Sequence, residues 1–283
     1  MTKNTFFRKK VTLNAGGRLI DLSSPKVMGI INITPDSFFA DSRKPGVDEA
    51  LQQAEKMLTD GATFLDIGAY SSRPGAVDIS AQEETDRLLP VVEAIAAQFP
   101  EVIMSIDTFR ANVAEAAVKG GAHIINDISG GMLDADMFAT VARLQVPYIL
   151  MHMKGTPQTM NQLAKYDDVF GEVFDYFISK YSELKRLGVH DVILDPGFGF
   201  AKKAEHSYEL MSRMNEFNIL GLPVLTGISR KRMIYGLLGN TAEEALNGTT
   251  ALNTIALTKG TNILRVHDVK EAAEAVQIWE ACQ

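Results

Sequence analysis

The chain has 283 residues, 46% of them hydrophobic, and its 35 acidic and 28 basic residues give a formal net charge of −7. This length fits one large α/β barrel or two ordinary domains, and the composition is typical of a globular protein with a sizeable core. The acidic balance argues against broad binding of nucleic acid or of an anionic membrane, because both need an excess of Lys and Arg. An anionic substrate would therefore need a local basic cluster.

The cysteine content and the N-terminal segment indicate a cytoplasmic protein. Cys282 is the single cysteine, so no internal disulfide can form, which fits a reducing compartment. The basic N-terminal segment is not followed by the apolar stretch of a signal peptide. No apolar run reaches the roughly 18 residues that a transmembrane helix needs. No linker or shift in composition divides the chain, so we expect one domain over residues 1–283.

A β-hairpin is the first expected element. Lys10–Leu13 and Arg18–Leu22 flank the turn Asn14–Gly17, and this extension, residues 1–24, would close the N-terminal end of a barrel. Short apolar runs then alternate with longer helical stretches eight times, as parallel strands covered on both faces do. The expected strands are Val27–Asn32, Thr63–Ile67, Val102–Asp107, His123–Asp127, Pro147–His152, Asp191–Asp195, Val224–Ile228 and Asn262–His267.

Helix signals fill the intervals between these runs. Val47–Thr59 has helical apolar spacing, and Ser80 with Glu83 forms a capping box that opens the helix Glu83–Phe99. Thr241 with Glu244 forms a second such box. Four glycines follow helical stretches where a left-handed residue is commonly needed: Gly61, Gly120, Gly188 and Gly260. Eight such units predict a (β/α)8 TIM barrel with an N-terminal hairpin; the alternative is a doubly wound open sheet, which would more often stop at five to seven strands.

Polar residues collect where the expected strands end, which is the catalytic face of such a barrel. They are Asn32, Asp36, Ser71–Gly75, Asp107, Asn126, Asp127, His152, Asp195, Ser229–Arg232, Arg265, His267 and Asp268. We expect Asp66 to have a structural hydrogen-bonding role. We also expect His152 to be a satisfied histidine beneath the site rather than a base.

This rim divides by charge. Asp107, Asn126 and Asp195 supply acceptors that suit the NH and NH2 donors along one edge of an aminopyrimidine ring. Four residues supply donors and positive charge that suit a diphosphate: Arg230, Lys231, Arg265 and His267. The side-chain oxygen of Asn32 could hold Mg2+, with diphosphate oxygens and waters completing the octahedron.

These residues lie in runs that resemble the signatures of the dihydropteroate synthases. The runs are Asn32–Phe38, Ser71–Gly75, Ser105–Thr108, Ile125–Ile128, Met151–Gly155, Lys165–Asp168, Leu194–Phe200, Ser229–Lys231 and Arg265–Asp268. They follow the family's order and span nearly the whole chain after the hairpin. The resemblance implies a transferase of folate biosynthesis that condenses 6-hydroxymethyl-7,8-dihydropterin diphosphate with p-aminobenzoate to 7,8-dihydropteroate and diphosphate.

The resemblance also implies a role for individual residues. Asn32 would contact Mg2+ and the diphosphate, and the loops around Asp36 and Arg73 would close over p-aminobenzoate beside Lys231. The pterin would be held by Ser72, Asp107, Asn126, Asp195 and Lys231. Arg265 and His267 would bind the diphosphate, and Phe200 with Lys231 would border the p-aminobenzoate pocket. The resemblance further implies a homodimer and a sulfonamide target.

Four departures from the commonest family pattern fall on loops near the aminobenzoate side. Tyr70 replaces an acid, and Ser72 replaces Thr while keeping a hydroxyl. Phe39 begins a run that replaces Ser-Asp-Gly, and Arg232 replaces a small hydroxyl residue.

Three other functions remain open. Methyltetrahydrofolate-dependent methyltransferases share the barrel and the acidic pterin pocket but need no diphosphate site. A pterin-binding paralogue without catalysis would have Tyr70 or Phe39 blocking the second substrate. A Schiff-base aldolase would use Lys231 as its amine.

Overall fold

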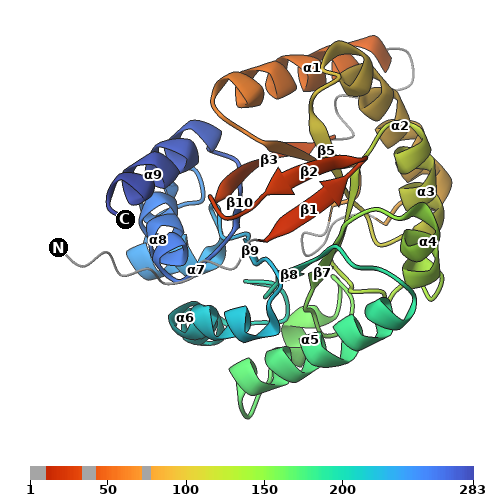
Figure 1. Cartoon of the computed structure of the whole chain (residues 1–283). Coiled ribbons are helices and arrows are strands. Elements are labelled where there is room, and N and C mark those ends of the chain that lie inside the picture. Colours follow the sequence, from red (N-terminus) through yellow and green to blue (C-terminus); the bar gives the residue numbers. More distant parts are fainter. Residues whose placement is uncertain (1–10, 34–42, 72–77) are drawn as a thin grey trace.

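The structure, a computed structural model of the chain, describes residues 11–33, 43–71 and 78–283. Its centre is a ring of parallel strands with helices outside it, seen end-on in Figure 1. The strands are β1 Thr12–Ala15, β2 Arg18–Asp21, β3 Lys26–Asn32, β4 Phe64–Gly68, β5 Ile103–Asp107, β6 Ile124–Asp127, β7 Tyr148–Met151, β8 Val192–Asp195, β9 Leu225–Thr226 and β10 Ile263–Val266.

The helices follow the strands in alternation. They are α1 Arg43–Thr59, α2 Ala81–Gln98, α3 Ala111–Lys119, α4 Met137–Leu144, α5 Val169–Arg186, α6 Ala204–Arg213, α7 Arg232–Leu238, α8 Leu246–Thr258 and α9 Val269–Ala281, with 3-10 helices η2 Met160–Leu163 and η3 Met214–Leu220. Within the described ranges, no helix is long and apolar enough to cross a membrane. Every residue of β4, β6, β7 and β8 is buried, as expected for strands covered on both faces.

The eight strands from β3 to β10 close into a ring. Their order is β8-β7-β6-β5-β4-β3-β10-β9, and each neighbouring pair is parallel. β8 and β9 meet through one parallel bridge between Leu194 and Val224, and the Leu194 N–H donates to the Pro223 carbonyl at 2.8 Å. The predicted (β/α)8 barrel is confirmed, and the open doubly wound sheet is wrong.

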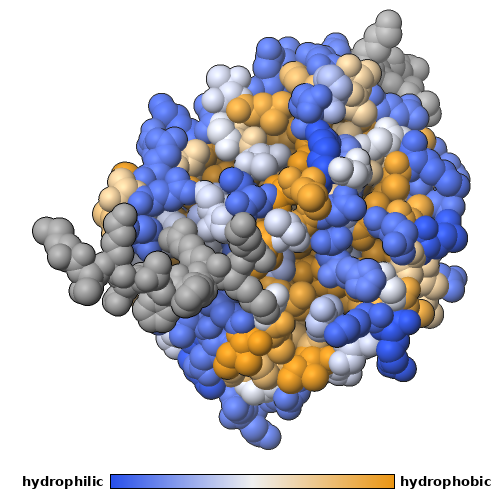
Figure 2. All heavy atoms as spheres, in the orientation of Figure 1, coloured by the Kyte–Doolittle hydropathy of each residue, from blue (hydrophilic) through white to orange (hydrophobic). Residues whose placement is uncertain are grey.

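The antiparallel hairpin β1–β2 closes the N-terminal end of the barrel, as predicted. One apolar residue from each barrel strand forms the lowest interior layer: Met28, Phe64, Ile103, Ile124, Ile149, Ile193, Leu225 and Ile263. The hairpin adds Leu13, Ala15, Ile20 and Leu22 to the same buried cluster. Figure 1 shows the hairpin crossing this end, and Figure 2 shows apolar residues between hydrophilic ones over the central part of the same face.

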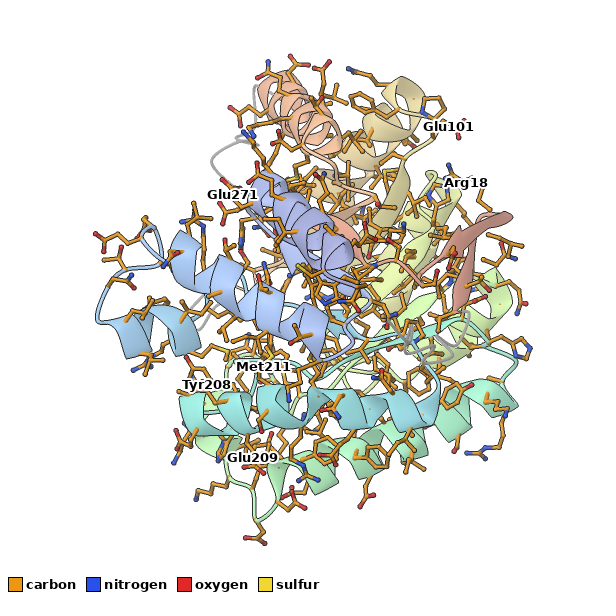
Figure 3. All side chains as sticks on the ribbon, turned by 60° about the vertical axis from the view of Figure 1, so that its left-hand side comes forward. Arg18, Glu101, Tyr208, Glu209, Met211 and Glu271 are labelled. Atoms are coloured by element: carbon orange, nitrogen blue, oxygen red, sulfur yellow. The ribbon has the colours of Figure 1, made fainter. Side chains whose placement is uncertain are left out.

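A hydrogen-bonded arginine fastens the hairpin to the barrel. Arg18 donates to the Glu101 carbonyl at 2.7 Å and to the Val102 carbonyl at 3.1 Å, just before β5 begins. Figure 3 places Arg18 and Glu101 close together at the edge of the molecule. The hairpin is therefore held by polar contacts at its edge as well as by its apolar face.

One of the four expected left-handed helix ends needs correction. Gly61, Gly188 and Gly260 have positive φ as predicted, but Gly120 has φ −79° and its neighbour Gly121 takes the positive value, 113°. The turn after α3 continues in the right-handed region for one residue more than expected, which moves the left-handed position along the chain.

The two capping boxes have different outcomes. Ser80 caps α2, and its side chain accepts from the Glu83 N–H at 3.1 Å. The Glu244 carboxylate accepts from the Thr241 N–H at 3.1 Å, but α8 begins only at Leu246. The second box therefore stabilises a turn instead of opening a helix.

The hairpin's contribution to stability can be measured with one substitution and a matched control. We expect Leu22→Ala, at a fully buried position in the lowest layer, to reduce the free energy of unfolding by about 2–5 kcal/mol. Leu19→Ala, on the same hairpin but 77% exposed, should change it by less than about 0.5 kcal/mol. Denaturant unfolding followed by circular dichroism measures both, and equal losses would contradict a closing role for the hairpin.

Candidate active site

Side chains alternate along each strand, so every second residue faces the barrel interior. In the upper part of the barrel many of these inward residues are polar. Two residues beyond the lowest layer, the strands direct inward Ile30, Asp66, Ser105, Asn126, Met151, Asp195, Gly227 and Arg265. Two residues further along, at or just beyond the strand ends, come Asn32, Gly68, Asp107, Ile128, Met153, Gly197, Ser229 and His267. Six of the predicted site residues are therefore placed at these two levels, above an apolar base: Asn126, Asp195, Arg265, Asn32, Asp107 and His267.

Two glycines lie in this polar part. A Cβ at Gly68 would lie 3.2 Å from the Cβ of Asp107, a tighter contact than Cβ atoms usually make, so the close approach of β4 and β5 at this level favours glycine. A Cβ at Gly227 would meet side-chain carbons of Arg265 and Leu225 at 3.9 Å, an ordinary van der Waals distance. Gly68 is therefore the glycine on which the packing of the site depends more.

One buried carboxylate organises the floor of the site. Oδ2 of Asp66 accepts from Arg265 Nε at 2.6 Å and from Asn126 Nδ2 at 3.0 Å. Arg265 Nη2 also donates to Oδ2 of Asp107 at 2.7 Å. Three predicted site residues, Arg265, Asn126 and Asp107, are thus joined through Asp66. The expected hydrogen-bonding role of Asp66 is confirmed, but sequence reasoning had not identified these site residues as its partners.

The carboxylates of the site are held in an environment of low polarity. Burial raises the pKa of Asp107 to about 7, although the Arg265 charge opposes the shift. Burial also raises the pKa of Asp195, which is 6% exposed, and Lys231 is the foremost opposing charge. A ligand that donates N–H groups to these oxygens would favour their ionised forms and would be bound more tightly for it.

Lys231 lies against the turn that follows β8. Its Nζ donates to the Phe198 carbonyl at 2.6 Å and lies 4.8 Å from the ring centre of Phe200. Burial lowers the pKa of Lys231 to about 8, with Asp195 opposing. Asp195 Oδ1 accepts from the Gly197 N–H at 2.8 Å, so the carboxylate, the turn and the amine form one unit.

Two predicted rim residues stand at the mouth of the barrel. Asn32 ends β3, is exposed, and is in register with Gly68, which in turn is in register with Asp107. His267 follows β10, and its Nδ1 lies 3.0 Å from the Ser229 hydroxyl. Both are placed where a ligand entering the barrel would pass.

Arg230 is a correction to the predicted basic cluster. Its guanidinium donates to both oxygens of Asp268, at 2.9 and 2.8 Å, and to the carbonyls of Ala242 and Glu243. These four bonds hold the loop before α8 against the end of β10. Arg230 is therefore a structural residue and not a free cation for a diphosphate.

Tyr70 joins three loops on the opposite side of the rim. Its ring meets the edge of Phe109 at 5.0 Å, and Gln158 Nε2 lies 3.3 Å from its hydroxyl, to which it donates. The guanidinium of Arg110 lies 5.2 Å from the Tyr70 ring and pairs with the buried Glu84. Tyr70 thus ties the loops after β4, β5 and β7 together.

Three predicted site residues, Asp36, Ser72 and Arg73, lie outside the described residues. Phe39, one of the departures from the family pattern, also lies outside them.

The predicted role of His152 agrees with its surroundings. It is buried, its Nδ1 lies 2.9 Å from Lys202 Nζ, and burial lowers its pKa to about 2. A histidine that stays neutral beneath the site cannot take up a proton near neutral pH. Lys202 was missed, because a lysine after a glycine-rich turn is ordinarily solvated.

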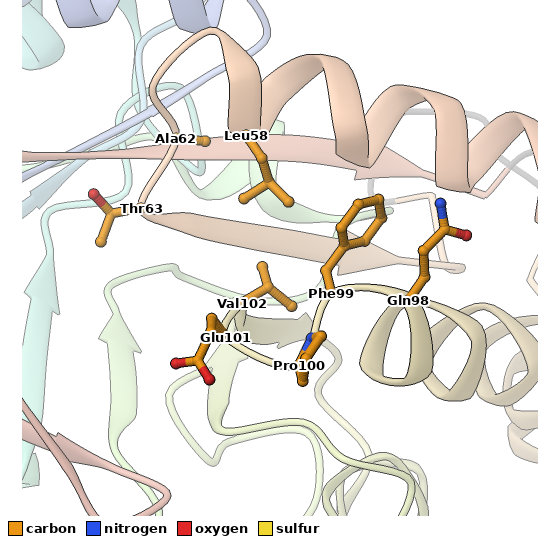
Figure 4. Close-up of a pocket in the computed structure, with 8 residues that line it drawn as sticks. All are labelled: Leu58, Ala62, Thr63, Gln98, Phe99, Pro100, Glu101 and Val102. Carbon is orange, nitrogen blue, oxygen red and sulfur yellow. The ribbon is translucent and has the colours of Figure 1, made fainter.

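A cavity of about 370 Å3 lies at the other end of the barrel strands, beside the starts of β4 and β5. It is lined by Leu58, Ala62, Thr63, Gln98, Phe99, Pro100, Glu101 and Val102. Figure 4 shows Leu58, Phe99 and Val102 directed toward one apolar space. Because its lining lacks converging charged groups, the rim remains the candidate active site.

Comparisons with known proteins agree with this assignment. The model of a family described as "Pterin binding enzyme" matches residues 28–267. The chain is 45% identical over 271 residues to the dihydropteroate synthase of Escherichia coli K12, covering 95% of both chains. The sulfonamide complex of the Yersinia pestis dihydropteroate synthase is similar in structure, with 42% identity, a TM-score of 0.90 and coverage of 96% and 99%.

A second solved structure has the same fold with a small aromatic acid bound. The Xanthomonas albilineans dihydropteroate synthase with 4-aminobenzoic acid is 37% identical, with a TM-score of 0.89 and coverage of 97% of this chain and 98% of that one. The relatives and the solved structures cover nearly the whole chain, and the family model covers the barrel without the N-terminal hairpin. The chain therefore belongs to the pterin-binding enzymes, among the dihydropteroate synthases.

Proposed function

We propose that this enzyme is a transferase that condenses 6-hydroxymethyl-7,8-dihydropterin diphosphate with p-aminobenzoate, forming 7,8-dihydropteroate and diphosphate in folate biosynthesis. The observation that carries the proposal is the joining of buried acceptors and cations in one site, through Asp66, Arg265 and Asp107. The relatives solved with a sulfonamide and with 4-aminobenzoic acid support an arylamine as second substrate. On the same ground we propose that sulfonamides compete for this site.

The acceptors inside the barrel read the pterin. Asp195 keeps one oxygen for the Gly197 N–H, which leaves its second oxygen for the donors of the aminopyrimidine edge. Asn126 and Asp107, fixed by Asp66 and Arg265, supply the remaining contacts. Ser72 is assigned to the same substrate by resemblance alone.

The cations and Asn32 take the diphosphate. Arg265 has a third guanidinium nitrogen, Nη1, for which the described residues supply no hydrogen-bond partner. With His267 at the mouth, it is placed to bind phosphate oxygens. Among the described residues, no group of three or more His, Cys, Asp or Glu side chains could hold a metal ion by itself.

A single amide oxygen, Asn32, instead fits Mg2+ that is bound together with the diphosphate. Asn32 lies beside Glu49 in a hollow of about 40 Å3, and Mg2+ commonly keeps several waters and takes few protein oxygens. When bound, Mg2+ supplies charge that stabilises the leaving diphosphate.

The residues of the chain then act by position and charge. Breaking the bond between the pterin methylene carbon and the diphosphate oxygen builds positive charge on the pterin, and Asp107 and Asp195 lie beside that ring. The arylamine nitrogen is already a nucleophile, so alignment matters more than a general base. Lys231 and Phe200 border its pocket, and Asp36 and Arg73 are assigned by resemblance to the loops that close over it.

We further propose that the enzyme is a homodimer that associates through α7 and α8. Three large apolar side chains are exposed there: Leu237, Leu238 and Ile255, at 70%, 55% and 43%. In Figure 3 these helices, in the paler blues, come forward at the side of the barrel without another element over them. A second copy covering this surface would bury them.

The reaction is tested by diphosphate release from 6-hydroxymethyl-7,8-dihydropterin diphosphate. We expect release that requires both Mg2+ and p-aminobenzoate and yields dihydropteroate. Pterin binding without release would favour the non-catalytic paralogue. Methyl transfer from methyltetrahydrofolate would favour the methyltransferase, and a borohydride-trapped adduct at Lys231 would favour the aldolase.

Replacing one acceptor tests how the pterin is recognised. We expect Asp195→Asn to weaken binding of the pterin alcohol by about 10–200-fold, because a mixed donor-acceptor amide leaves one ligand N–H unpaired. Asp191→Asn, just before the other end of the same strand, should leave the affinity unchanged. Titration calorimetry of both folded variants gives the comparison, and equal affinities would remove Asp195 from the pterin site.

The proposed dimer surface can be disrupted with a buried charge. We expect Leu237→Glu to give a monomer in sedimentation velocity, because an unpaired carboxylate cannot be enclosed between two subunits. Leu19→Glu, at a similarly exposed position on the hairpin, should keep the dimer mass. A wild-type monomer would overturn the proposed dimer, and a dimer that tolerates Leu237→Glu would place its interface elsewhere.

A further inference from the structure

Lys202 is a buried lysine with no carboxylate bound to it. Its side chain belongs to a residue that is 8% exposed, and no ion pair involves it among the described residues. Its Nζ instead has four neighbours: His152 Nδ1 at 2.9 Å and the carbonyl oxygens of His152, Gly197 and Phe200, each at 3.1 Å. Lysine is rarely buried, because removing its amine from water costs free energy. The burial of Lys202 among carbonyl oxygens therefore calls for a structural or functional explanation.

The cage joins two segments of the active-site rim. His152 follows β7, and Gly197 and Phe200 begin and end the turn after β8. One amine therefore fixes both ends of the turn to each other and to the neighbouring strand.

The turn that Lys202 holds is an unusual one. Gly197 and Gly199 have φ of 68° and 80°, and Ala201 has φ of 49°, where a side chain is disfavoured. A Cβ at Gly197 would lie 2.1 Å from the His152 carbonyl oxygen, so the turn is pressed against β7. Backbone in such a conformation persists only where its surroundings fix it.

The same turn carries two groups that contact Lys231, which borders the proposed p-aminobenzoate pocket. The carbonyl of Phe198, between the two carbonyls that Lys202 binds, accepts from Lys231. The Phe200 ring lies against Lys231 Nζ. Two lysines thus share the carbonyls of one turn, Lys202 within the core and Lys231 at the site.

The electrostatics agree with this geometry. Burial lowers the pKa of Lys202 well below its ordinary value, with Asp195 opposing and Lys231 and Lys154 adding to the shift. His152 stays neutral beside it. The three carbonyl oxygens accept from the amine, so its hydrogen bonds are made within the cage although no counter-ion is bound.

We propose that Lys202 is a positioning residue of the reaction. It fixes the Gly197–Phe200 turn so that the Phe198 carbonyl and the Phe200 ring hold Lys231 at the border of the arylamine pocket. The proposal deepens the proposed function and rests on it for the identity of the second substrate. Lys202 acts through the turn and touches no substrate.

The first test replaces the amine with an apolar group of similar length. We expect Lys202→Met to raise KM for p-aminobenzoate about tenfold or more, because the pocket wall shifts, and to weaken binding of the pterin alcohol by a clearly smaller factor, because Asp107 and Asn126 are held independently of the turn. Lys203→Met, at the exposed neighbouring lysine, should leave both unchanged. Equal losses for both substrates, or an unchanged KM, would overturn the proposal.

A second readout follows the pKa of Lys231 and needs no turnover. NMR titration of 13C-methylated lysines should show the Lys231 pKa near 8 in the wild type, because burial lowers it. It should rise toward its ordinary value in Lys202→Met, because a loosened turn admits water to Nζ. An unchanged pKa would contradict positioning through the turn, whether or not the wild type releases diphosphate.

A third variant covers failure of the first to fold. Lys202→Gln retains a donor for part of the cage, and we expect it to fold and to shift KM and the Lys231 pKa in the same directions by smaller amounts. A folded Lys202→Gln with wild-type values for both would overturn the proposal. If diphosphate release is absent from the wild type, the proposed function fails, and the NMR titration alone decides the role of Lys202.

Discussion

The closed ring of eight strands is the constraint on which the rest of the structure depends. Because the ring closes through Leu194 and Val224, every second residue of each strand must point into a space shared with seven other strands. The lowest layer is apolar on all strands and is covered by the hairpin. Polar side chains one and two layers higher cannot reach solvent below, so they bond to each other, to the turns at the rim or to a ligand. The site is therefore a consequence of where each strand changes from apolar to polar residues.

This arrangement separates the source of stability from the source of function. Arg265 lies 2.6 and 2.7 Å from two carboxylates, and charges at such distances attract by several kcal/mol at an effective dielectric of about 20. The loss of hydration also costs several kcal/mol for each buried ion, so the cluster adds little net stability. The pKa of Asp107 is raised because the loss of hydration on burial disfavours its ionised form. The apolar base and the outer helices supply the stability, and the charged floor is kept ready for a ligand.

The sequence predicts the barrel and the rim well because both depend on local patterns. Apolar runs mark the strands, and the residue type at the end of each run marks its contribution to the site. Partner choice is not local. Arg230 and Arg265 look alike in sequence, yet Arg265 lies on the inside of β10, whereas Arg230 has φ of 55° and turns toward Asp268. The segment expected to open a helix at Thr241 stays a turn, and carbonyls within it bind Arg230. The Thr241–Glu244 turn and the structural role of Arg230 are therefore linked, because Arg230 binds the carbonyls that this turn presents.

Lys231 can be recognised as a site residue from the sequence, whereas Lys202 cannot, because its partners also are not local. Lys231 belongs to a run of charged residues after a strand, a position that itself indicates a phosphate or substrate site. Lys202 stands beside Lys203, and two adjacent lysines are ordinarily both exposed to solvent. The sequence therefore gives no sign that one of the two is buried. Its burial follows from the preceding turn, whose positive φ values bring the chain back against β7. Glycines that permit a turn are visible in a sequence, but the carbonyls that the turn leaves pointing inward are not. A buried amine is a natural partner for such carbonyls, because it supplies several donors from a single atom.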